Sequence, residues 1–307
     1  MKLKIIAILI SMLLIIGSSF QVIAHLSEIN VNNSFANTWT VDNEGDGDFT
    51  SIQEAIDNSS VLDGDTIEVY SGTYNEDVDV YKELILEGID NELPPNGTDT
   101  GMPIIDSNGQ DNVITISKFI DERIDNVEVS GFIIQNSGMG NSGILIDYAR
   151  NIKINDNILQ MNYFGVSIER VDTVLVGSND IIENNIGISI ENSDNNDFID
   201  NFIDNNTEYG IRLERTQTTD ISQNTISNTG DIGVYLLRSS GNEITSNDFI
   251  NNNNQATFLN CFNYWRGNSW DDNNFPFIIY IIWGSFRLFP DIPWLVIPIP
   301  QIDWNPI

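Results

Sequence analysis

The sequence predicts an all-β protein, a single-stranded right-handed parallel β-helix with about 22–23 residues in each coil. Three observations lead to this prediction. One pattern recurs five times between Gly143 and Asn253, at steps of 22, 22, 23 and 23 residues. Within each repeat, β-branched residues alternate with other residues in segments of three to five residues bounded by Gly, Asn, Asp or Ser, which is typical of short strands. The variation in step falls only in the asparagine-rich link before the next Gly, so the strand register is constant.

Four apolar columns and one asparagine column run through these repeats. The apolar columns are Gly143-Ile144, Gly165-Val166, Gly187-Ile188, Gly210-Ile211 and Gly233-Val234; Ile146, Ile168, Ile190, Leu213 and Leu236; Ile154, Val176, Phe198, Ile221 and Ile244; and Leu159, Ile181, Ile203, Ile226 and Phe249. Because stacked coils lie about 4.8 Å apart, each column is predicted to form an apolar ladder inside the coil. The asparagine column is Asn157, Asn179, Asn201, Asn224 and Asn247. We expect it at a turn, with left-handed backbone and hydrogen bonds to the next coil.

The Gly-aliphatic-x-aliphatic step, followed by Asn-x-Ile and asparagine pairs, resembles the right-handed parallel β-helix repeats of the pectin-lyase-like superfamily. The most similar members are the NosD-like proteins and the carbohydrate-binding and sugar-hydrolysis type proteins of archaeal and bacterial surfaces. The resemblance covers most of the chain after the leader and implies the fold. It does not select an activity, because that superfamily includes lyases, hydrolases, esterases, epimerases and non-catalytic scaffolds.

Residues 1–24 are predicted to be a secretory signal. Lys2 and Lys4 provide the positive end, Ile5–Ile16 the apolar run, and Val22–Ala24 the small residues of a cleavage site. The apolar run is short for a membrane span, so we expect cleavage and no transmembrane segment afterwards, with a retained anchor as the alternative. The predicted location is secreted or extracellular, at the cell surface.

Residues 25–37 form a predicted leader, and residues 38–88 an N-terminal cap with the first coil. Overlapping capping boxes (Thr50 to Gln53, Ser51 to Glu54) predict a short amphipathic helix. We expect it to cover the end of the β-helix, where the core and unpaired strand edges would otherwise be open. The Gly-x-Tyr-x-Glu of residues 72–76 is similar to a motif of pectinesterase-like proteins.

Residues 89–260 are predicted to hold the β-helix repeats, and residues 261–307 an aromatic C-terminal cap. Five of the six tryptophans lie in the last 43 residues: Trp265, Trp270, Trp283, Trp294 and Trp304. A solenoid must be closed at both ends, which favours a cap. The alternative is an aromatic docking patch for a sugar or a neighbouring protein.

The composition limits the possible partners. The formal net charge is −32, and removal of a signal with two lysines would make it −34, which argues against nucleic acid and anionic membranes. Such a charge suits a surface protein, a divalent-cation binder or a salty environment. The single cysteine, Cys261, excludes an intramolecular disulfide. Four sequons, at Asn32, Asn58, Asn96 and Asn205, permit glycosylation in a host that performs it.

One acidic column directly follows the second apolar column: Asp147, Glu169, Glu191 and Glu214. Alternation directs these side chains outward, and stacked carboxylates repel one another unless they are paired. Arg170, Arg215 and Arg238 could pair with them, giving a solvated charged face. A second interpretation is a site for a ligand or cation, with calcium as the possible cofactor. A third is catalysis by Glu169 and Glu191 in a polysaccharide lyase or glycoside hydrolase.

Other catalytic and metal-binding signatures are absent or incomplete. The only histidine is His25, so the Gly-His-Gly of polygalacturonase-like sites and the Asp-Pro-His-Glu of alginate-epimerase-like sites are missing. The segment Asp42–Asp48 is similar to a calcium loop, but its twelfth position is Gln53 rather than Glu, so we predict a turn. Copper prefers sulfur and imidazole ligands, and no such cluster occurs.

The predicted function is therefore a non-catalytic surface scaffold or carbohydrate-interacting module, which would bind polysaccharide or other cell-surface components. A polysaccharide lyase or hydrolase is the alternative, and a NosD-like copper-site maturation factor is a third possibility. No residue is assigned a catalytic role beyond the candidates Glu169 and Glu191.

Overall fold

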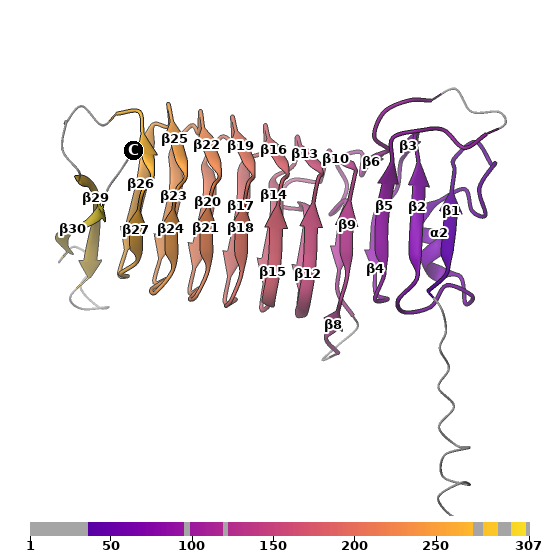
Figure 1. Ribbon diagram of the computed structural model, residues 1–307, viewed down its shortest axis with the longest axis horizontal. Coiled ribbons are helices and arrows are strands. Elements are labelled where there is room, and N and C mark those ends of the chain that lie inside the picture. Colours follow the sequence, from indigo (N-terminus) through magenta and orange to yellow (C-terminus); the bar gives the residue numbers. More distant parts are fainter. Residues whose placement is uncertain (1–35, 95–98, 119–121, 273–278, 288–295, 305–307) are drawn as a thin grey trace, which may run out of the picture. The chain divides into compact units, whose positions relative to one another are not determined.

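The computed structural model describes residues 36–94, 99–118, 122–272, 279–287 and 296–304. The chain divides into two units, Met1–Ala36 and Asn37–Ile307, and the described helix and strands belong to the second. In that unit the coils stack side by side along one axis (Figure 1). The predicted signal, and the predicted leader up to residue 35, lie outside the described residues. In the described part of the chain, no helix combines the length and apolar character needed to cross a membrane.

The coils form a parallel β-helix with three faces, which confirms the predicted fold class. Face A is formed by β4 (Val78–Val80), β7 (Ile114–Ile116), β11 (Ser142–Asp147), β14 (Phe164–Glu169), β17 (Ile186–Glu191), β20 (Tyr209–Glu214), β23 (Ile232–Leu237) and β26 (Asn254–Leu259). Face B is formed by β1 (Thr38–Val41), β2 (Thr66–Tyr70), β5 (Ile85–Ile89), β9 (Glu128–Ser130), β12 (Ala149–Asn155), β15 (Asp172–Gly177), β18 (Asp197–Ile199), β21 (Asp220–Ser222), β24 (Glu243–Thr245) and β27 (Tyr264–Arg266), with the short β8 (Ile124–Asp125) beside β12. Face C is a nine-stranded sheet of β3 (Thr73–Tyr74), β6 (Ile104–Asp106), β10 (Ile133–Gln135), β13 (Ile158–Gln160), β16 (Asp180–Ile182), β19 (Phe202–Asp204), β22 (Thr225–Ser227), β25 (Asp248–Ile250) and β28 (Ser269–Trp270).

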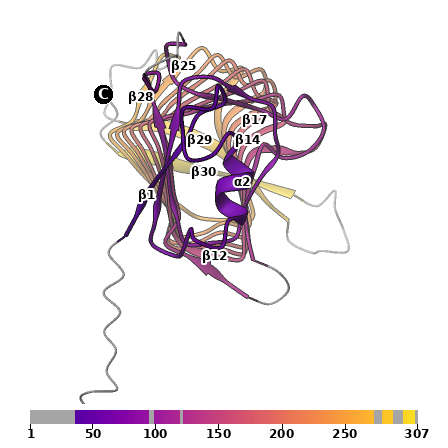
Figure 2. The same cartoon turned by 90° about the vertical axis from the view of Figure 1, so that its right-hand side faces the viewer.

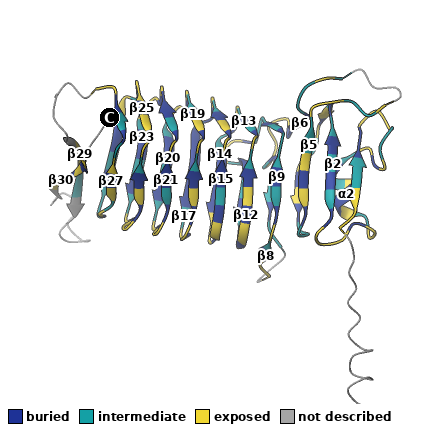
Figure 3. Ribbon diagram, in the orientation of Figure 1, coloured by how far each residue is buried: buried dark blue, intermediate teal, exposed yellow. Residues whose placement is uncertain are grey.

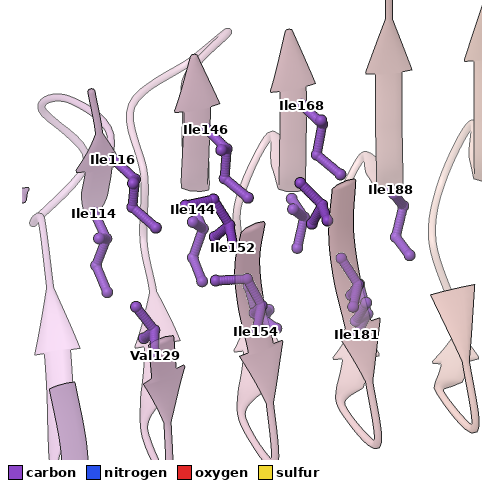
Figure 4. Packing of buried hydrophobic residues seen from close by; sticks show 14 of the residues in the cluster. Ile114, Ile116, Val129, Ile144, Ile146, Ile152, Ile154, Ile168, Ile181 and Ile188 are labelled. Carbon is purple, nitrogen blue, oxygen red and sulfur yellow. The ribbon is translucent and has the colours of Figure 1, made fainter. Parts of the chain in front are cut away.

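The predicted apolar columns form the core. Ile146 pairs in register with Ile168, and Ile168 with Ile190, and each of the three is at most 1% exposed. Figure 3 shows buried positions running along the strands of successive coils, and Figure 4 shows the aliphatic side chains of neighbouring coils stacked on one another. Burial of such columns is the main stabilising contribution, because no single coil can cover its own apolar side.

The asparagine column forms a continuous hydrogen-bond ladder. The backbone N–H of Asn157 donates to Oδ1 of Asn179 (3.1 Å), and the same bond joins Asn179 to Asn201 (3.1 Å). The ladder continues through Asn224, Asn247 and Asn268 with distances of 2.9–3.0 Å. Every bond has the same direction, from the N–H of one coil to the side chain of the next, so the ladder needs an acceptor at its C-terminal end.

The expectation of left-handed backbone in the asparagine column is wrong. Positive φ, between 55° and 60°, occurs instead at the residue before each asparagine: Asp156, Ser178, Asp200, Gln223 and Ser246. The column residues are at most 1% exposed, because their side chains turn inward to serve the neighbouring coils. The chain therefore bends at the preceding residue, and the asparagine is selected for its hydrogen bonds rather than for its backbone conformation.

A short helix, α2 (Ile52–Asp57), lies beside the first coil, at the end nearest the viewer in Figure 2. Its N-cap is Ser51, whose Oγ accepts from the N–H of Glu54 (3.1 Å), which is one of the two hydrogen bonds of the predicted Ser51–Glu54 capping box; the Glu54 carboxylate accepts from the hydroxyl of Thr50 (3.4 Å). The carboxylate of Glu76 accepts from the N–H groups of Ile52 and Gln53 (both 2.9 Å). The Gly-x-Tyr-x-Glu motif thus holds the helix N-terminus. The role of α2 as a cap for the core stays a prediction.

The other end carries an antiparallel hairpin of β29 (Ile279–Arg287) and β30 (Val296–Trp304). β29 pairs with β26 and β30 pairs with β27, so the hairpin joins faces A and B into one 21-stranded sheet. Figure 2 shows the two strands lying across the cross-section of the coils. Of the predicted cap tryptophans, Trp265 and Trp270 are buried, Trp283 (60%) and Trp304 (56%) are exposed, and Trp294 lies outside the described residues.

Candidate functional site

The acidic column lies on face A, where each of its members is the last residue of a strand. The register places Asp147 beside Glu169, Glu169 beside Glu191, and Glu191 beside Glu214. The residue that follows each acid has positive φ: Tyr148, Arg170, Asn192 and Arg215. The chain therefore bends directly after each carboxylate, and the column runs along the edge between faces A and B.

Arginines pair with three of the four carboxylates. Arg170 donates to Asp147 through Nε (2.9 Å) and Nη2, so the arginine reaches back by one coil. Arg215 reaches back to Glu191 in the same way and also pairs with Glu214 (2.6 Å).

Two arginines depart from the predicted pairing. Arg212, which the sequence analysis did not identify, forms a second ion pair with Glu214 at 2.6 Å. Arg238 was expected to join the column, but among the described residues it forms no ion pair. The acidic column ends at Glu214, and the next two positions in the same register are occupied by Leu237 and Leu259. Arg238 therefore follows a leucine rather than a carboxylate.

Glu169 differs from the other members of the column, because in the described part of the chain it has no ion-pair partner within 4.0 Å. Burial raises the pKa of its carboxyl, the charges of Asp147 and Glu191 raise it further, and Arg170 lowers it. Its carboxyl therefore retains a proton to a higher pH than a free glutamate, which is a property of a general acid.

A cleft of about 520 Å³ lies at the N-terminal end of the acidic column. Its lining residues are Gln53, Asp57, Asp77, Asp79, Tyr81, Ser117 and Lys118. Val80 and Ile116 share a register with Ile146, so Tyr81 and Ser117 occupy the positions before Asp147 in the column.

Hydrogen bonds hold the wall of this cleft. The hydroxyl of Tyr81 donates to Asp57 (2.8 Å), and the N–H of Asp79 donates to the side chain of Gln53 (2.7 Å). Burial and the charges of Asp111, Asp77 and Asp57 raise the pKa of Asp79. The sequence analysis missed the cleft, because only the packing of α2 against β4 brings these residues together.

A tyrosine pair lies further along face A. The rings of Tyr209 (β20) and Tyr235 (β23) stack with centroids 5.4 Å apart and an angle of 16° between their planes. Tyr235 is the register partner of Arg212, which is ion-paired with Glu214. Face A therefore carries, in order, the cleft, the acidic column and the stacked tyrosines.

A family described as "Periplasmic copper-binding protein (NosD)" matches residues 56–275, which is most of the chain. The chain belongs to the NosD family. This result confirms the resemblance seen in the repeats. It covers α2 from its fifth residue, the lining of the cleft except Gln53, the acidic column and the tyrosine pair.

Further similarities concern parts of larger proteins. This NosD-family chain is 33% identical over 151 residues to a "Cell surface glycoprotein" of Methanothermus fervidus, an alignment that covers 48% of the chain and 20% of that protein. Among solved structures, the periplasmic alginate epimerase AlgG matches with a TM-score of 0.54 at 15% identity (75% of this chain, 65% of that one). XylC in complex with xylose matches with a TM-score of 0.52 at 12% identity (76% and 67%). At these identities the structures show the shared fold alone.

The described residues of this NosD-family chain do not fit a copper site. Cys261 is buried, burial raises the pKa of its thiol, and its Sγ donates to the carbonyl of Leu236 (3.5 Å). Met139 and Met161 are 96% and 46% exposed, so they lie at the surface, whereas the thiol of Cys261 lies in the core. Within the described ranges no three His, Cys, Asp or Glu side chains converge as metal ligands, and His25 lies outside those ranges.

The four glycosylation candidates are placed unequally. Asn205 is exposed at a corner with φ 55°, whereas Asn58 follows α2 and its Oδ1 accepts from the N–H of Ser60 (2.9 Å). Asn32 and Asn96 lie outside the described residues.

Proposed function

We propose that this chain is a cell-surface β-helix protein that binds polysaccharide along face A without cleaving it. The observation that carries the proposal is the arginine pairing of the acidic column. Asp147, Glu191 and Glu214 are held by Arg170, Arg212 and Arg215, so they present fixed planar groups rather than free carboxylates. Retaining and inverting glycosidases need two available carboxyl groups at a defined separation. In this column only Glu169 is unpaired.

The chemistry of face A supports sugar recognition. Paired carboxylates and guanidinium groups offer hydrogen-bond acceptors and donors in fixed positions, which suits the hydroxyl groups of a sugar. Aromatic rings provide rigid apolar contact area with a polar edge. The tyrosine pair and Tyr81 in the cleft place such rings at two points of the same face. A linear polymer could contact both points, whereas a small ligand could contact only one.

The location at the cell surface rests on two similarities and one sequence feature. The family description refers to the periplasm, and the relative from Methanothermus fervidus is a cell surface glycoprotein. The predicted signal at residues 1–24 is consistent with export. The mode of attachment to the cell is open.

A second candidate function is a polysaccharide lyase or hydrolase. One observation favours it: the raised pKa of Glu169, which lies between Asp147 and Glu191. A carboxyl group with a raised pKa can act as a general acid at a higher pH than a free glutamate. In this case Glu191, despite its pairing with Arg215, would have to supply the second carboxylate.

A panel of acidic and neutral polysaccharides tests both functions. Binding and depolymerisation would be measured with and without calcium. For the binding function we expect saturable binding without release of reducing ends or unsaturated products. Tyr235→Ala should weaken binding about five- to 150-fold, if a sugar ring gains from the tyrosine about the 1–3 kcal/mol that a stacked base gains from an aromatic side chain.

The matched control is Phe202→Ala, which removes a ring that is 42% exposed on face C. Equal loss of binding in both variants would contradict recognition by face A. Depolymerisation that Glu169→Gln abolishes would replace the binding function by the enzymatic one.

A further inference from the structure

The predicted turn at Asp42–Asp48 encloses a buried carboxylate. The turn is closed by hydrogen bonds from the N–H of Asp42 to the carbonyl of Phe49 (3.0 Å) and from the N–H of Gly45 to the carbonyl of Asp42 (3.1 Å). The side chain of Asp42 is 0% exposed. Its Oδ1 accepts from the N–H of Glu44 (2.7 Å), but its Oδ2 has no hydrogen-bond partner.

A second carboxylate, that of Glu92, is buried in the same region. Both of its oxygens are out of contact with solvent and without a partner, although the residue as a whole is partly exposed. The carbonyl of the preceding Asn91 accepts from Ser71 (3.0 Å), and the side chain of Asn43 donates to the carbonyl of Thr73 (3.4 Å). The turn and the Glu92 segment therefore both lie against residues 71–73.

The negative charge of Asp42 acts on the carboxyl group of Glu92, in line with the packing of both segments against residues 71–73. The pKa of Glu92 is raised by burial, then by the charge of Asp42, and then by Glu44, Asp99 and Asp46. Neither Asp42 nor Glu92 has an ion pair with a lysine or arginine in the described part of the chain. Three unpartnered oxygens of two buried carboxylates would destabilise the fold by several kcal/mol if nothing compensated their charge.

We propose that Asp42 and Glu92 bind a calcium ion, which joins the first turn of the β-helix to the segment after β5. Calcium accepts six to eight oxygen ligands in irregular geometry, so neutral oxygens and water can complete a site with two carboxylates. Magnesium demands a stricter octahedron, and zinc and copper prefer nitrogen and sulfur. Because only two ligands are charged, the Kd should fall at about 10⁻⁴–10⁻³ M, the range of extracellular calcium modules.

Calorimetric titration of the metal-free full chain with calcium chloride, together with melting curves, tests this site. We expect one saturable site in the stated range and a melting temperature that rises by a few degrees at saturation. Asp42→Asn and Glu92→Gln should each weaken calcium binding at least about tenfold and remove the rise in melting temperature. Asp90→Asn, which removes the same charge from a nearby exposed residue, should behave like the unchanged protein.

Three outcomes would overturn the proposal. One is the absence of a calcium-dependent shift in the unchanged protein at about 10 mM, well above the expected Kd. Another is an equal shift in Glu92→Gln, which would place the ion elsewhere. The last is an Asp90→Asn variant that loses the calcium response as fully as Glu92→Gln, since surface charge in general rather than the buried pair would then explain the shift. Glu92→Gln is informative even if Asp42→Asn does not fold, because Glu92 lies in a partly exposed segment.

Discussion

Both ends of the β-helix bury a carboxylate, but the C-terminal one accepts three hydrogen bonds, whereas Asp42 at the N-terminal end accepts one, from the N–H of Glu44. Asp303 is 0% exposed, and its Oδ2 accepts from the N–H and Nδ2 of Asn268 (3.1 and 3.0 Å) and from the indole of Trp270 (2.8 Å). At the N-terminal end, Oδ2 of Asp42 and both oxygens of Glu92 have no such donor. Oδ1 of Asp303 also has no partner, but its Oδ2 completes the hydrogen-bond network of the last coils, whereas the N-terminal pair forms the proposed calcium site.

The direction of the amide ladders explains this difference. Each ladder runs from a backbone N–H to the side chain of the next coil, so it starts with a donor and leaves a donor at its C-terminal end. β30 supplies the missing acceptors: Asp303 ends the asparagine ladder, and Gln301 accepts from the N–H of Asn263 (3.0 Å) and the indole of Trp265 (2.9 Å). Only the C-terminal end of a directional ladder needs an acceptor.

Deletion of residues 261–307 should have the largest effect on this comparison. It removes β27–β30 with Gln301 and Asp303, and it opens the core at Phe258, Ile244 and Phe249, whose register partners are Gly284, Trp265 and Trp270. We expect aggregation, or fraying of the last coils while the middle coils stay ordered, because open strand edges promote self-association. Light scattering and melting curves on residues 25–260 would measure it. A monomeric protein with an unchanged melting curve would show that the segment is a docking patch instead.

Ile190→Asp tests how strongly the stability of the protein depends on the core of a regular middle coil, for comparison with the ends. Ile190 is 1% exposed in β17, and a carboxylate there has no partner, which should destabilise the protein by several kcal/mol and disrupt cooperative unfolding. Chemical denaturation would measure the loss. Its outward neighbour Ser189 is a poor control, because adjacent side chains leave it only 7% exposed. Phe202→Asp, at a position 42% exposed, should change stability little; equal losses would contradict the assigned strand register.

Asp303→Asn tests whether the side chain of Asp303 accepts its hydrogen bonds in the charged or in the protonated form. Burial raises the pKa of Asp303 above 3.8, while its hydrogen bonds lower it, and the net shift is upward. Its protonated form is therefore favoured by folding, so this contribution is complete below pH 3.8 and is lost as the pH rises through the raised pKa. The variant keeps the acceptor but does not titrate. Its stability relative to the unchanged protein should thus increase between about pH 4 and 7.

Urea unfolding across this pH range would measure the trend. A constant difference between Asp303→Asn and the unchanged protein would show that the pKa is not raised. Asp303→Ala, which removes the acceptor altogether, should be about 1–3 kcal/mol less stable than Asp303→Asn at every pH, because neither variant titrates and the donors of Asn268 and Trp270 stay buried in both.

Glu76→Gln should have the smallest effect, at the N-terminal end. It removes the charge at the N-terminus of α2 and turns one of the two accepting oxygens into an NH2 group, which cannot accept from Ile52 or Gln53, at a cost of about 1 kcal/mol. Chemical denaturation would show this small loss, and Glu83→Gln, another acidic residue in the same coil, should show less. A loss of several kcal/mol would indicate that the whole N-terminal end depends on this contact.

The repeat alone determined the fold, the coil length, the apolar ladders and the order of the acids along face A. These features follow from local periodicity, since a constant offset within each coil places the same position of successive coils side by side. The left-handed corners were assigned to the wrong residue, because the sequence does not distinguish an asparagine that bends the chain from one that bonds to the next coil.

The tertiary structure alone decided the contacts that occur once in the molecule rather than in every coil. The hydrogen bonds of the cleft wall, the link from Glu76 to α2, and the termination of the ladders by Gln301 and Asp303 join residues 23 to 38 positions apart, without a period that would reveal them. The same is true of Asp42 and Glu92, which only the folding of two loops against residues 71–73 brings together. Periodic contacts can be read from spacing, whereas single contacts depend on how the chain leaves and re-enters the regular coils.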